Sequence, residues 1–352
     1  MRKNNSILFI GGCGHGKETT NGVSAKNYYL LRRLREFCDK VAVVDTDGWN
    51  RNPIILFKLI LFLIVYHNYQ LVISLNPGSA YLFIRFISII FPKRKICYFV
   101  IGGNLPTRMK NENIRPYQRC VKWFLVESQT MKEQMEQMGF TNTLHVPNFK
   151  NITHIPVKAQ HGNSSTHIRY VFLSRIIPEK GCDYILDACK LLNDMGYSKR
   201  FSVSFYGPLD KVYKTKFLHE VQQTTNVEYK GFLDLRNDKN YDTLAEYDAM
   251  LFPTYWHGEG FPGIVIDAFI AGVPVIATDW RHNKEFIHDH QTGILIPPYD
   301  VQKLSEVMKQ VIDNPSILQE MNDLCQKQAM YYDVHHILTD SLFEMILKRD
   351  KK

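Results

Sequence analysis

The strongest candidate site in this 352-residue chain lies in residues 251–280, LFPTYWHGEGFPGIVIDAFIAGVPVIATDW. An apolar run is followed by a loop that carries Glu259 into the sequence GFPG, and we expect a helix to begin near Pro262 and end at Gly272. The predicted order is strand, Gly-rich loop, helix, strand. Such a loop presents backbone N–H groups at a helix N-terminus, where the helix dipole favours an anion such as a diphosphate.

The side chains of this loop and helix have distinct expected roles. Gly260 and Gly263 leave room for a ligand to contact backbone N–H groups. Asp267 lies one turn beyond Gly263 on the same helical face, where its carboxylate can accept hydrogen bonds from ribose hydroxyls. Glu259 is placed to reach the hydroxyls of a sugar beyond the phosphates. The candidate ligand-binding residues of this segment are Glu259, Gly260, Phe261, Pro262, Gly263 and Asp267.

Two cations in VFLSRIIPEKGCDYILDA, residues 171–188, complement these groups. Arg175 follows a predicted strand and Lys180 precedes a glycine and a helix, so we expect both at the sheet edge that carries Glu259. Arg offers a planar fork and Lys a point charge to phosphate oxygens. Gly207 ends a further predicted strand and joins the candidate site. The alternative is that both cations form surface ion pairs.

The N-terminal sequence GGCGHGKETT, residues 11–20, nearly matches a nucleoside-triphosphate P-loop. Gly11 to Lys17 fit the pattern, but Glu18 stands where a Ser or Thr would coordinate magnesium, which makes phosphate hydrolysis a weak alternative. We expect a backbone-lined turn before a helix near Ser24, open to an anion or an acceptor.

Two further motifs bear on metals and redox chemistry. The DTD sequence at 45–47 could hold a metal ion, or its acidic residues could cap a turn; three residues are a weak signal, and we expect no metal. The seven cysteines contain no C-x-x-C pair, so we expect reduced thiols.

Short apolar runs alternate with helical patterns along the chain and predict two α/β domains with parallel sheets. A polar connection at 148–168 separates the two series. In such sheets, ligands bind at the carboxyl ends of strands. The predicted strands are SILFIGG, KVAVVDTD, QLVISLN, KICYFVIGG and WFLVES, then RYVFLSR, FSVSFYG, VEYKGF, AMLFPT and VPVIATD.

Charge and hydropathy add a membrane alternative. Residues 1–160 hold 22 Lys and Arg against 9 Asp and Glu, whereas residues 161–352 hold 21 against 26, and the basic half attracts phosphates or anionic lipid. The apolar segments 52–66 and 80–91 are too short to span a bilayer, which requires about 18 residues. They predict helices buried against a sheet or, alternatively, partial insertion at a membrane surface, helped by PKRK at 92–95.

These residues resemble the GT-B-fold retaining glycosyltransferases of the family-four (group 1) type, from the polysaccharide-biosynthesis branch. The matching segments are SRIIPEKG, SFYG, YKGF, HGEGFPGIVIDAFIAGVPVIATD, NKEFI, TGILIPP and VPNFK. The resemblance implies two Rossmann-like doubly wound domains facing across a cleft. Residues 1–160 would form the acceptor-side domain, 161–330 the donor-binding domain, and 331–352 a helix returning to the first domain.

The resemblance also implies roles for the site residues. Arg175 and Lys180 would hold the donor diphosphate, Glu259 the donor sugar, and the GFPG amides the leaving group. Asp267 stands where the family usually has a second Glu. The acceptor-side wall would include Gly12, Gly22, Gly103 and Asn104.

The expected activity is metal-independent transfer of a sugar, with retention, from a nucleotide-diphosphate sugar to a lipid-linked or surface-polysaccharide acceptor. No cofactor and no nucleic acid are expected. The N-terminal apolar stretch is too short for a signal peptide, so we expect a cytoplasmic protein, peripheral at the inner face of the membrane. The alternatives are a sugar-nucleotide epimerase on the same fold and a non-enzymatic basic adaptor for membranes or nucleic acid.

Overall fold

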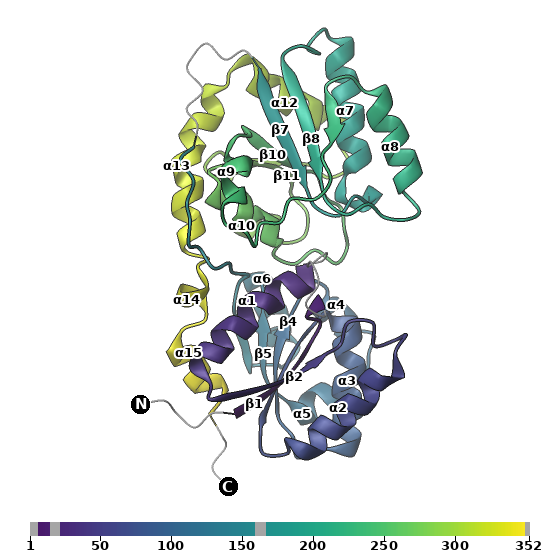
Figure 1. The fold of residues 1–352 in the computed structure, drawn as a ribbon, viewed down its shortest axis with the longest axis vertical. Helices are drawn as coiled ribbons and strands as arrows, with labels where there is room; N and C mark the ends of the chain where they lie inside the picture. Colours follow the sequence, from purple (N-terminus) through teal and green to yellow (C-terminus); the bar gives the residue numbers. More distant parts are fainter. Residues whose placement is uncertain (1–5, 15–21, 159–166, 349–352) are drawn as a thin grey trace. The chain divides into compact units, whose positions relative to one another are not determined.

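Apolar runs of up to six residues form the strands in the computed structural model, which describes residues 6–14, 22–158 and 167–348. All strand pairs are parallel, and the central strands of each sheet are buried on both faces, as their mainly apolar sequences predict, whereas some edge strands are partly exposed. The chain divides into two units (Figure 1): unit 1 contains Met1–Asn151 and Asp333–Lys352, and unit 2 contains Ile152–Tyr332.

The sheet of unit 1 has six strands in the order β2-β1-β3-β4-β5-β6. Along β1, alternate residues enter two separate cores, Leu8 and Ile10 on one face and Ile7 and Phe9 on the other, so helices cover both faces. The strands are β1 Ser6–Gly11, β2 Lys40–Asp45, β3 Gln70–Leu75, β4 Ile96–Val100, β5 Val121–Val126 and β6 Thr143–His145. The helices are α1 Gly22–Phe37, α2 Pro53–Val65, α3 Pro77–Ile90, α4 Leu105–Met109, α5 Arg115–Cys120, α6 Gln129–Gln137, α14 Val334–Ile337 and α15 Asp340–Ile346.

The sheet of unit 2 has the strand order β12-β11-β10-β7-β8-β9. Tyr170 and Phe172 of β7 face a core built with α7, α8 and α12, and Val171 faces a core built with α9, α10 and α13. The strands are β7 Ile168–Leu173, β8 Phe201–Tyr206, β9 Val227–Tyr229, β10 Ala249–Phe252, β11 Val275–Thr278 and β12 Gly293–Ile296. The helices are the 3-10 turn η2 Pro178–Lys180, α7 Cys182–Asp194, α8 Lys214–Gln223, α9 Asn240–Ala245, α10 Gly263–Ile270, α11 Asn283–Phe286, α12 Val301–Asp313 and α13 Ser316–Met330.

Unit 2 begins earlier than the expected boundary at residue 160. Ile152 packs against the core of unit 2, and Thr153 donates a hydrogen bond of 2.8 Å to Asp238. Lys158 donates to the carbonyl oxygen of Ala245 at 2.9 Å. Residues 152–158 of the polar connection are therefore attached to unit 2, and the division between the units lies at Asn151.

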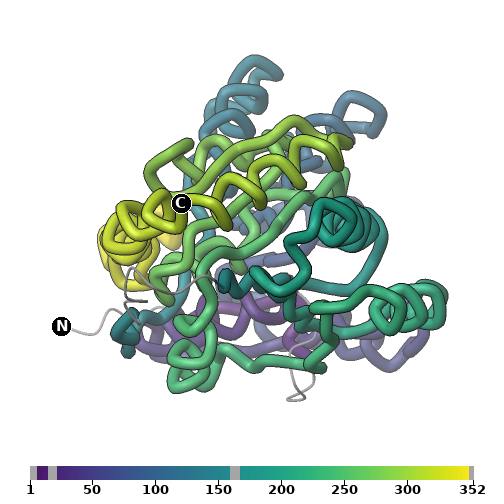
Figure 2. Tube along the Cα trace, turned by 90° about the horizontal axis from the view of Figure 1, so that it is seen from above, coloured from purple at the N-terminus to yellow at the C-terminus, as the bar shows by residue number. Residues whose placement is uncertain are grey.

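The C-terminal segment is part of unit 1, and it forms two short helices, α14 and α15, rather than one. The chain leaves α13 and joins unit 1 at Asp333, and Figure 2 draws this C-terminal part of the chain in yellow. The amide of Val334 donates to the carbonyl oxygen of Lys150 at 2.7 Å, and Phe343 is fully buried in the core that contains β1 and α1. This packing shields one face of the first sheet.

Two strands, β6 and β12, are absent from the sequence prediction. They have only three and four residues and lie at sheet edges, where a short run gives too few positions for a period-2 pattern. In the remaining strands, the predicted and observed positions agree to within a few residues at each end.

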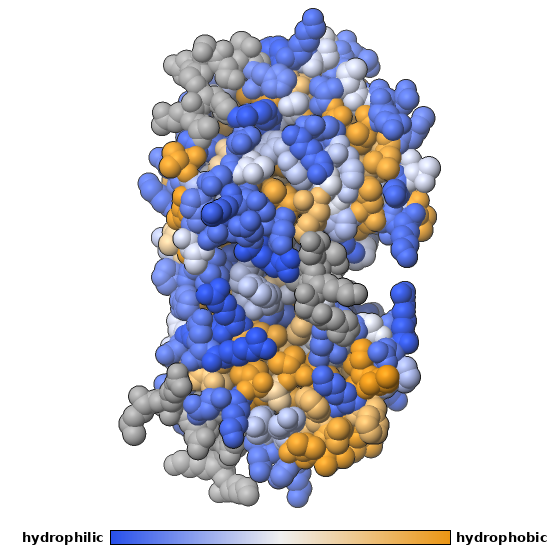
Figure 3. Space-filling view, viewed as in Figure 1, coloured by the Kyte–Doolittle hydropathy of each residue, from blue (hydrophilic) through white to orange (hydrophobic). Residues whose placement is uncertain are grey.

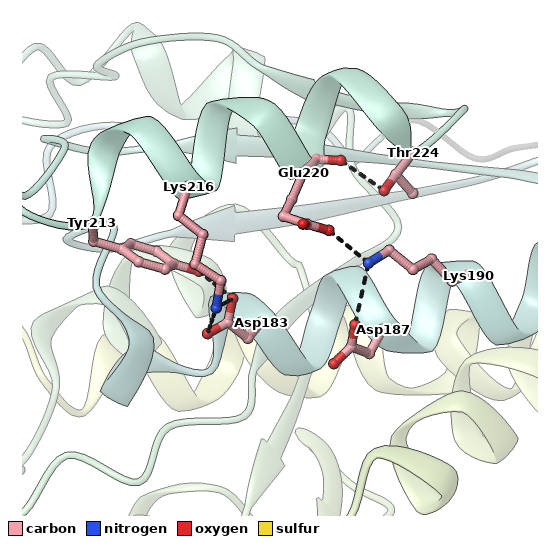
Figure 4. Close-up of polar contacts among 7 residues, drawn as sticks. All are labelled: Asp183, Asp187, Lys190, Tyr213, Lys216, Glu220 and Thr224. Atoms are coloured by element: carbon pink, nitrogen blue, oxygen red, sulfur yellow. Dashed lines mark hydrogen bonds and ion pairs between the residues drawn. The ribbon is translucent and has the colours of Figure 1, made fainter.

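A polar network fixes α7 to α8 on the surface of unit 2 (Figure 4). Asp183 accepts hydrogen bonds from Tyr213 at 2.7 Å and from Lys216 at 3.1 Å. Lys190 donates to Glu220 at 2.7 Å, and this bond holds the pKa of the Glu220 carboxyl below its ordinary value. The network orients α7, which begins directly after Lys180 and Gly181.

Candidate functional site

The loops after β7 and β10 meet at the carboxyl edge of the second sheet. Gly181 has φ +82°, and a Cβ atom there would lie 2.2 Å from the carbonyl oxygen of Pro253, so only glycine fits. The amide of Tyr255 donates to the carbonyl oxygen of Glu179 at 2.8 Å. Backbone therefore packs on backbone, which brings the neighbouring side chains of both loops together.

Lys180 and Glu259 form a buried ion pair at this junction. Each residue is 6% exposed, and Lys180 Nζ lies 2.5 Å from Glu259 Oε2. Thr254 Oγ1 donates to the same carboxylate oxygen at 2.9 Å. Because both charges are withdrawn from water, loss of either one would leave the other buried without its partner.

Arg175 joins this cluster from the end of β7. Its side chain is exposed, and the guanidinium carbon lies 5.2 Å from the ring centroid of Trp256. Trp256 belongs to the Glu259 loop, and its amide donates to Thr254 Oγ1 at 3.2 Å. The structure thus brings Arg175, Lys180 and Glu259 to one edge of the sheet, as the sequence predicted.

Gly207 is required by the backbone of the Arg175 turn. Its φ is +142°, and a Cβ atom there would lie 1.7 Å from the carbonyl oxygen of Ser174. Gly207 also donates from its amide to the carbonyl oxygen of Gly231 at 2.7 Å. Close packing against Ser174 therefore explains this glycine without any ligand, and donor binding at Gly207 stays a prediction.

The GFPG sequence leads into α10 through Pro262. With φ −68° and ψ 119°, Pro262 is the N-cap residue, and the first helical residue is Gly263, one position later than expected. Proline has no side-chain acceptor, so α10 starts without a side-chain cap. The backbone N–H groups of Gly263 and the next residues, together with the helix dipole, favour an anion at this end of α10.

The side chain of Phe261 lies in the core rather than toward a ligand. Its ring is 2% exposed and stacks on Phe286, with centroids 3.6 Å apart. Tyr332 meets the same ring edge-on at 4.8 Å. Phe261 therefore anchors the loop, and any contact it makes with a donor must come from its backbone.

Asp267 is buried within α10, one turn after Gly263. It is 4% exposed, and its Oδ1 accepts a hydrogen bond of 2.6 Å from Tyr241 on α9. The Tyr241 hydroxyl fixes the orientation of this carboxylate. Tyr241 has no motif signal, since its partner is 26 residues away in the chain.

The DTD carboxylates hold the N-terminal Gly loop in unit 1. Asp45 accepts a hydrogen bond from the amide of Cys13 at 2.9 Å, and Asp47 accepts one from the amide of Gly14. A Cβ atom on Gly12 would lie 2.5 Å from Asp47 Oδ1, so a larger residue there would displace the Asp47 side chain. In the portions of the chain that the structure describes, no cluster of three or more His, Cys, Asp or Glu forms a metal site.

The remaining unit 1 candidates lie at the start of α1 and in the loop after β4. Gly22 is exposed at the start of α1, and Gly103 is buried. Asn104 precedes α4 and makes no side-chain cap bond. The P-loop residues Lys17 and Glu18 lie outside the described residues.

The region from 153 to 329 matches the family described as glycosyl transferases group 1, which is half of the 352 residues. This chain belongs to that family. The match contains Arg175, Lys180, Glu259 and Asp267, but not the acceptor-side candidates of unit 1.

The curated relatives of this group 1 family member include proteins named for polysaccharide biosynthesis. An uncharacterized 41.2 kDa protein in the cps region of Klebsiella pneumoniae is 31% identical over 144 residues, covering 40% of this chain and 36% of the relative. A putative colanic acid biosynthesis glycosyltransferase, WcaL of Escherichia coli K12, is 26% identical over 155 residues, 43% of this chain and 36% of its own length. The chain thus spans little more than a third of these relatives.

Solved structures show that the group 1 chain has the GT-B fold, an α/β fold with two Rossmann-like domains. HepE of Anabaena, in complex with UDP and glucose, matches with a TM-score of 0.73 and 15% identity. The match covers 98% of this chain and 100% of the HepE chain. Sucrose-phosphate synthase of Thermosynechococcus elongatus matches with a TM-score of 0.76 and 14% identity, covering 97% and 99%.

Glu127, which directly follows β5, is a buried carboxylate for which the sequence analysis predicted no role. It is 2% exposed, pairs with Lys26 of α1 at 2.7 Å, and accepts a hydrogen bond of 3.0 Å from the amide of Gly102. It therefore holds α1 and the loop after β4 together. The available signal was an acidic residue at the carboxyl end of a predicted strand, WFLVES.

Proposed function

We propose that this chain is a retaining glycosyltransferase, which moves a sugar from a nucleotide-diphosphate sugar to an acceptor hydroxyl. The observation that carries the proposal is the buried ion pair of Lys180 and Glu259, whose loop leads into the uncapped start of α10. Arg175 lies over the ring of Trp256, which belongs to the same loop. Two cations and a helix N-terminus are the groups that a diphosphate requires. Residues 153–329 carry the family match, which supports the same activity.

In the proposed reaction, Arg175 and Lys180 bind the diphosphate oxygens, and the first amides of α10 stabilise the charge that develops on the leaving group. Glu259 contacts hydroxyls of the donor sugar while Lys180 and Thr254 hold its carboxylate in place. Asp267, oriented by Tyr241, binds the ribose hydroxyls. These groups provide the positive charge themselves, so we propose that no metal ion or cofactor takes part.

The contacts of Glu259 support the stereochemistry that we propose. Its carboxylate is bound by Lys180 and Thr254, which suits stabilisation of charge and not attack on the anomeric carbon. We propose that the departing diphosphate itself accepts the proton of the acceptor hydroxyl on the same face of the sugar. The new glycosidic bond then forms as the sugar–phosphate bond breaks, and the anomeric configuration is retained.

The acceptor is proposed to be a lipid-linked or growing surface polysaccharide. The relatives include proteins named for colanic acid and amylovoran biosynthesis, which supports a glycan acceptor. We propose that the enzyme works on the cytoplasmic side of the cell membrane, where nucleotide sugars are made.

The direct test is turnover with a panel of UDP-, ADP- and GDP-sugars and alkyl glycoside acceptors, beginning with UDP-glucose because HepE was solved with it. We expect nucleoside diphosphate release that depends on the acceptor and persists in EDTA, and a product whose anomeric configuration by NMR equals the donor's. An isomerised donor without transfer would indicate an epimerase instead. Inversion, or loss of turnover in EDTA, would overturn the corresponding part of the mechanism.

A further inference from the structure

Helix α2 of unit 1 exposes a large apolar surface. Among its 13 residues, only Ile55, Leu59 and Leu63 are buried, and these lie on one face of the helix. The prediction that this segment is buried against the sheet is therefore correct for one face alone. The exposed side chains, with their exposed fractions, are Ile54 70%, Leu56 38%, Phe57 69%, Ile60 40%, Leu61 44%, Ile64 57% and Val65 57%.

Helix α3 extends this surface. Ile89 is 63% and Ile90 is 55% exposed at its C-terminal end. Arg94, in the loop that follows, donates to the carbonyl oxygen of Leu63 at 3.2 Å, which links this loop to the last turn of α2. Hydrophobic side chains gather at the lower right of the space-filling view, where Figure 1 places α2 and α3 (Figure 3).

The chain around this surface is basic and has no acidic residue. Residues 48–111 contain eight Lys or Arg and no Asp or Glu. The exposed cations of α2, α3 and their flanking loops are Arg51, Lys58, Arg85, Lys93 and Lys95. This surface therefore combines exposed apolar side chains with positively charged ones.

We propose that the exposed faces of α2 and α3 bind the surface of a lipid bilayer that contains anionic lipids. Isoleucine, leucine and phenylalanine side chains insert at the boundary between headgroups and acyl chains, and the surrounding Lys and Arg meet the lipid phosphates. Helix α2 is about 20 Å long, shorter than the roughly 30 Å hydrocarbon core, so it lies along the surface. Over the described ranges, no helix is long and apolar enough to cross a membrane.

Charge favours a bilayer over a second copy of the chain as the occupant. A two-fold dimer through this surface would place the same basic patch on both sides of the interface, with like charges facing one another. Anionic lipid instead supplies the opposite charge. The proposal of membrane binding rests on exposed side chains of unit 1. It therefore does not depend on the proposed sugar transfer in unit 2.

The test is sedimentation with vesicles of phosphatidylcholine, with or without about 30% phosphatidylglycerol. One variant carries Ile54→Ser, Phe57→Ser and Ile64→Ser, and a second carries Lys58→Gln, Lys93→Gln and Lys95→Gln. The control is Val212→Ser in unit 2, an isolated apolar side chain that is 93% exposed. We expect binding to anionic vesicles that is at least about tenfold weaker in each triple variant, unchanged in the control, and reduced by salt.

Three outcomes would overturn the proposal. They are no binding of the wild type to anionic vesicles, unchanged binding in the Ser triple variant, and loss of a dimer in that variant by sedimentation velocity while vesicle binding persists. Circular dichroism and thermal melting confirm that each variant is folded. Nucleoside diphosphate release with a soluble acceptor is read separately, so a failure of membrane binding is distinguished from a failure of catalysis.

Discussion

At the scale of single residues, the buried pair of Lys180 and Glu259 has both a structural and a proposed chemical role. Two opposite charges out of water stabilise each other, but removal of one partner costs about 3–5 kcal/mol because the other charge stays buried. Arg175 differs, because its side chain is exposed and its contact among the described residues is with the Trp256 ring. Comparing variants of Arg175 with variants of the buried pair therefore separates a loss of catalysis from a loss of stability.

Lys180→Ala is expected to lower turnover at least roughly tenfold, since one charge-assisted hydrogen bond is worth about 1.5–3 kcal/mol, and to lower the free energy of unfolding as well. The double variant Lys180→Met with Glu259→Gln removes both charges. We expect it to recover most of the lost stability in urea denaturation while turnover stays low. Turnover near the wild-type value in the well-folded double variant would refute the diphosphate and sugar roles of the pair.

At the scale of elements, α15 contributes a large apolar side chain to the core of unit 1. Phe343 is fully buried, and its ring lies 5.2 Å from that of Phe37 and 5.5 Å from the guanidinium carbon of Arg33. The C-terminal segment is thus part of the hydrophobic core that covers one face of the unit 1 sheet.

Phe343→Ala is expected to destabilise unit 1 by about 3–5 kcal/mol, the usual cost of deleting a buried aromatic ring. Met345→Ala on the same helix is the matched control, because Met345 is 42% exposed, and its effect should stay within about 0.5 kcal/mol. The measurement is urea denaturation followed by tryptophan fluorescence. Equal and small effects of the two substitutions would show that α15 does not stabilise unit 1.

The elements of the sheets were largely predictable because a buried parallel strand is a continuous apolar run, as in ILFI at 7–10 and YVFL at 170–173. The Gly-rich loop before α10 was also predictable, because glycine and proline act through local backbone geometry. Pairings over long sequence separations were not. The Lys180–Glu259 and Tyr241–Asp267 contacts join residues 79 and 26 positions apart, and the inward turn of Phe261 depends on Phe286 and Tyr332.

At the scale of the whole molecule, chemistry and charge are divided between the two units. The residues that we propose to bind the diphosphate, Arg175, Lys180 and the start of α10, lie in unit 2, whereas the basic and apolar surface of α2 and α3 lies in unit 1. Sequence reasoning left two interpretations of α2 open, burial against the sheet and partial insertion at a membrane surface, because apolar side chains around the whole helix usually indicate burial. The structure shows which face of α2 packs against the core of unit 1 and which side chains are exposed among the described residues.

The most direct test of the diphosphate site is calorimetric binding of UDP, ADP and GDP, each compared with its nucleoside monophosphate. The wild type is expected to bind its best diphosphate at least about tenfold more tightly than the matching monophosphate, since in the proposed site two cations and the start of α10 contact the added phosphate. Arg175→Ala should reduce this preference by about tenfold, and Lys303→Ala, an exposed cation on α12, should leave it unchanged. Equal affinities for mono- and diphosphate, or an undiminished preference in Arg175→Ala, would contradict the site.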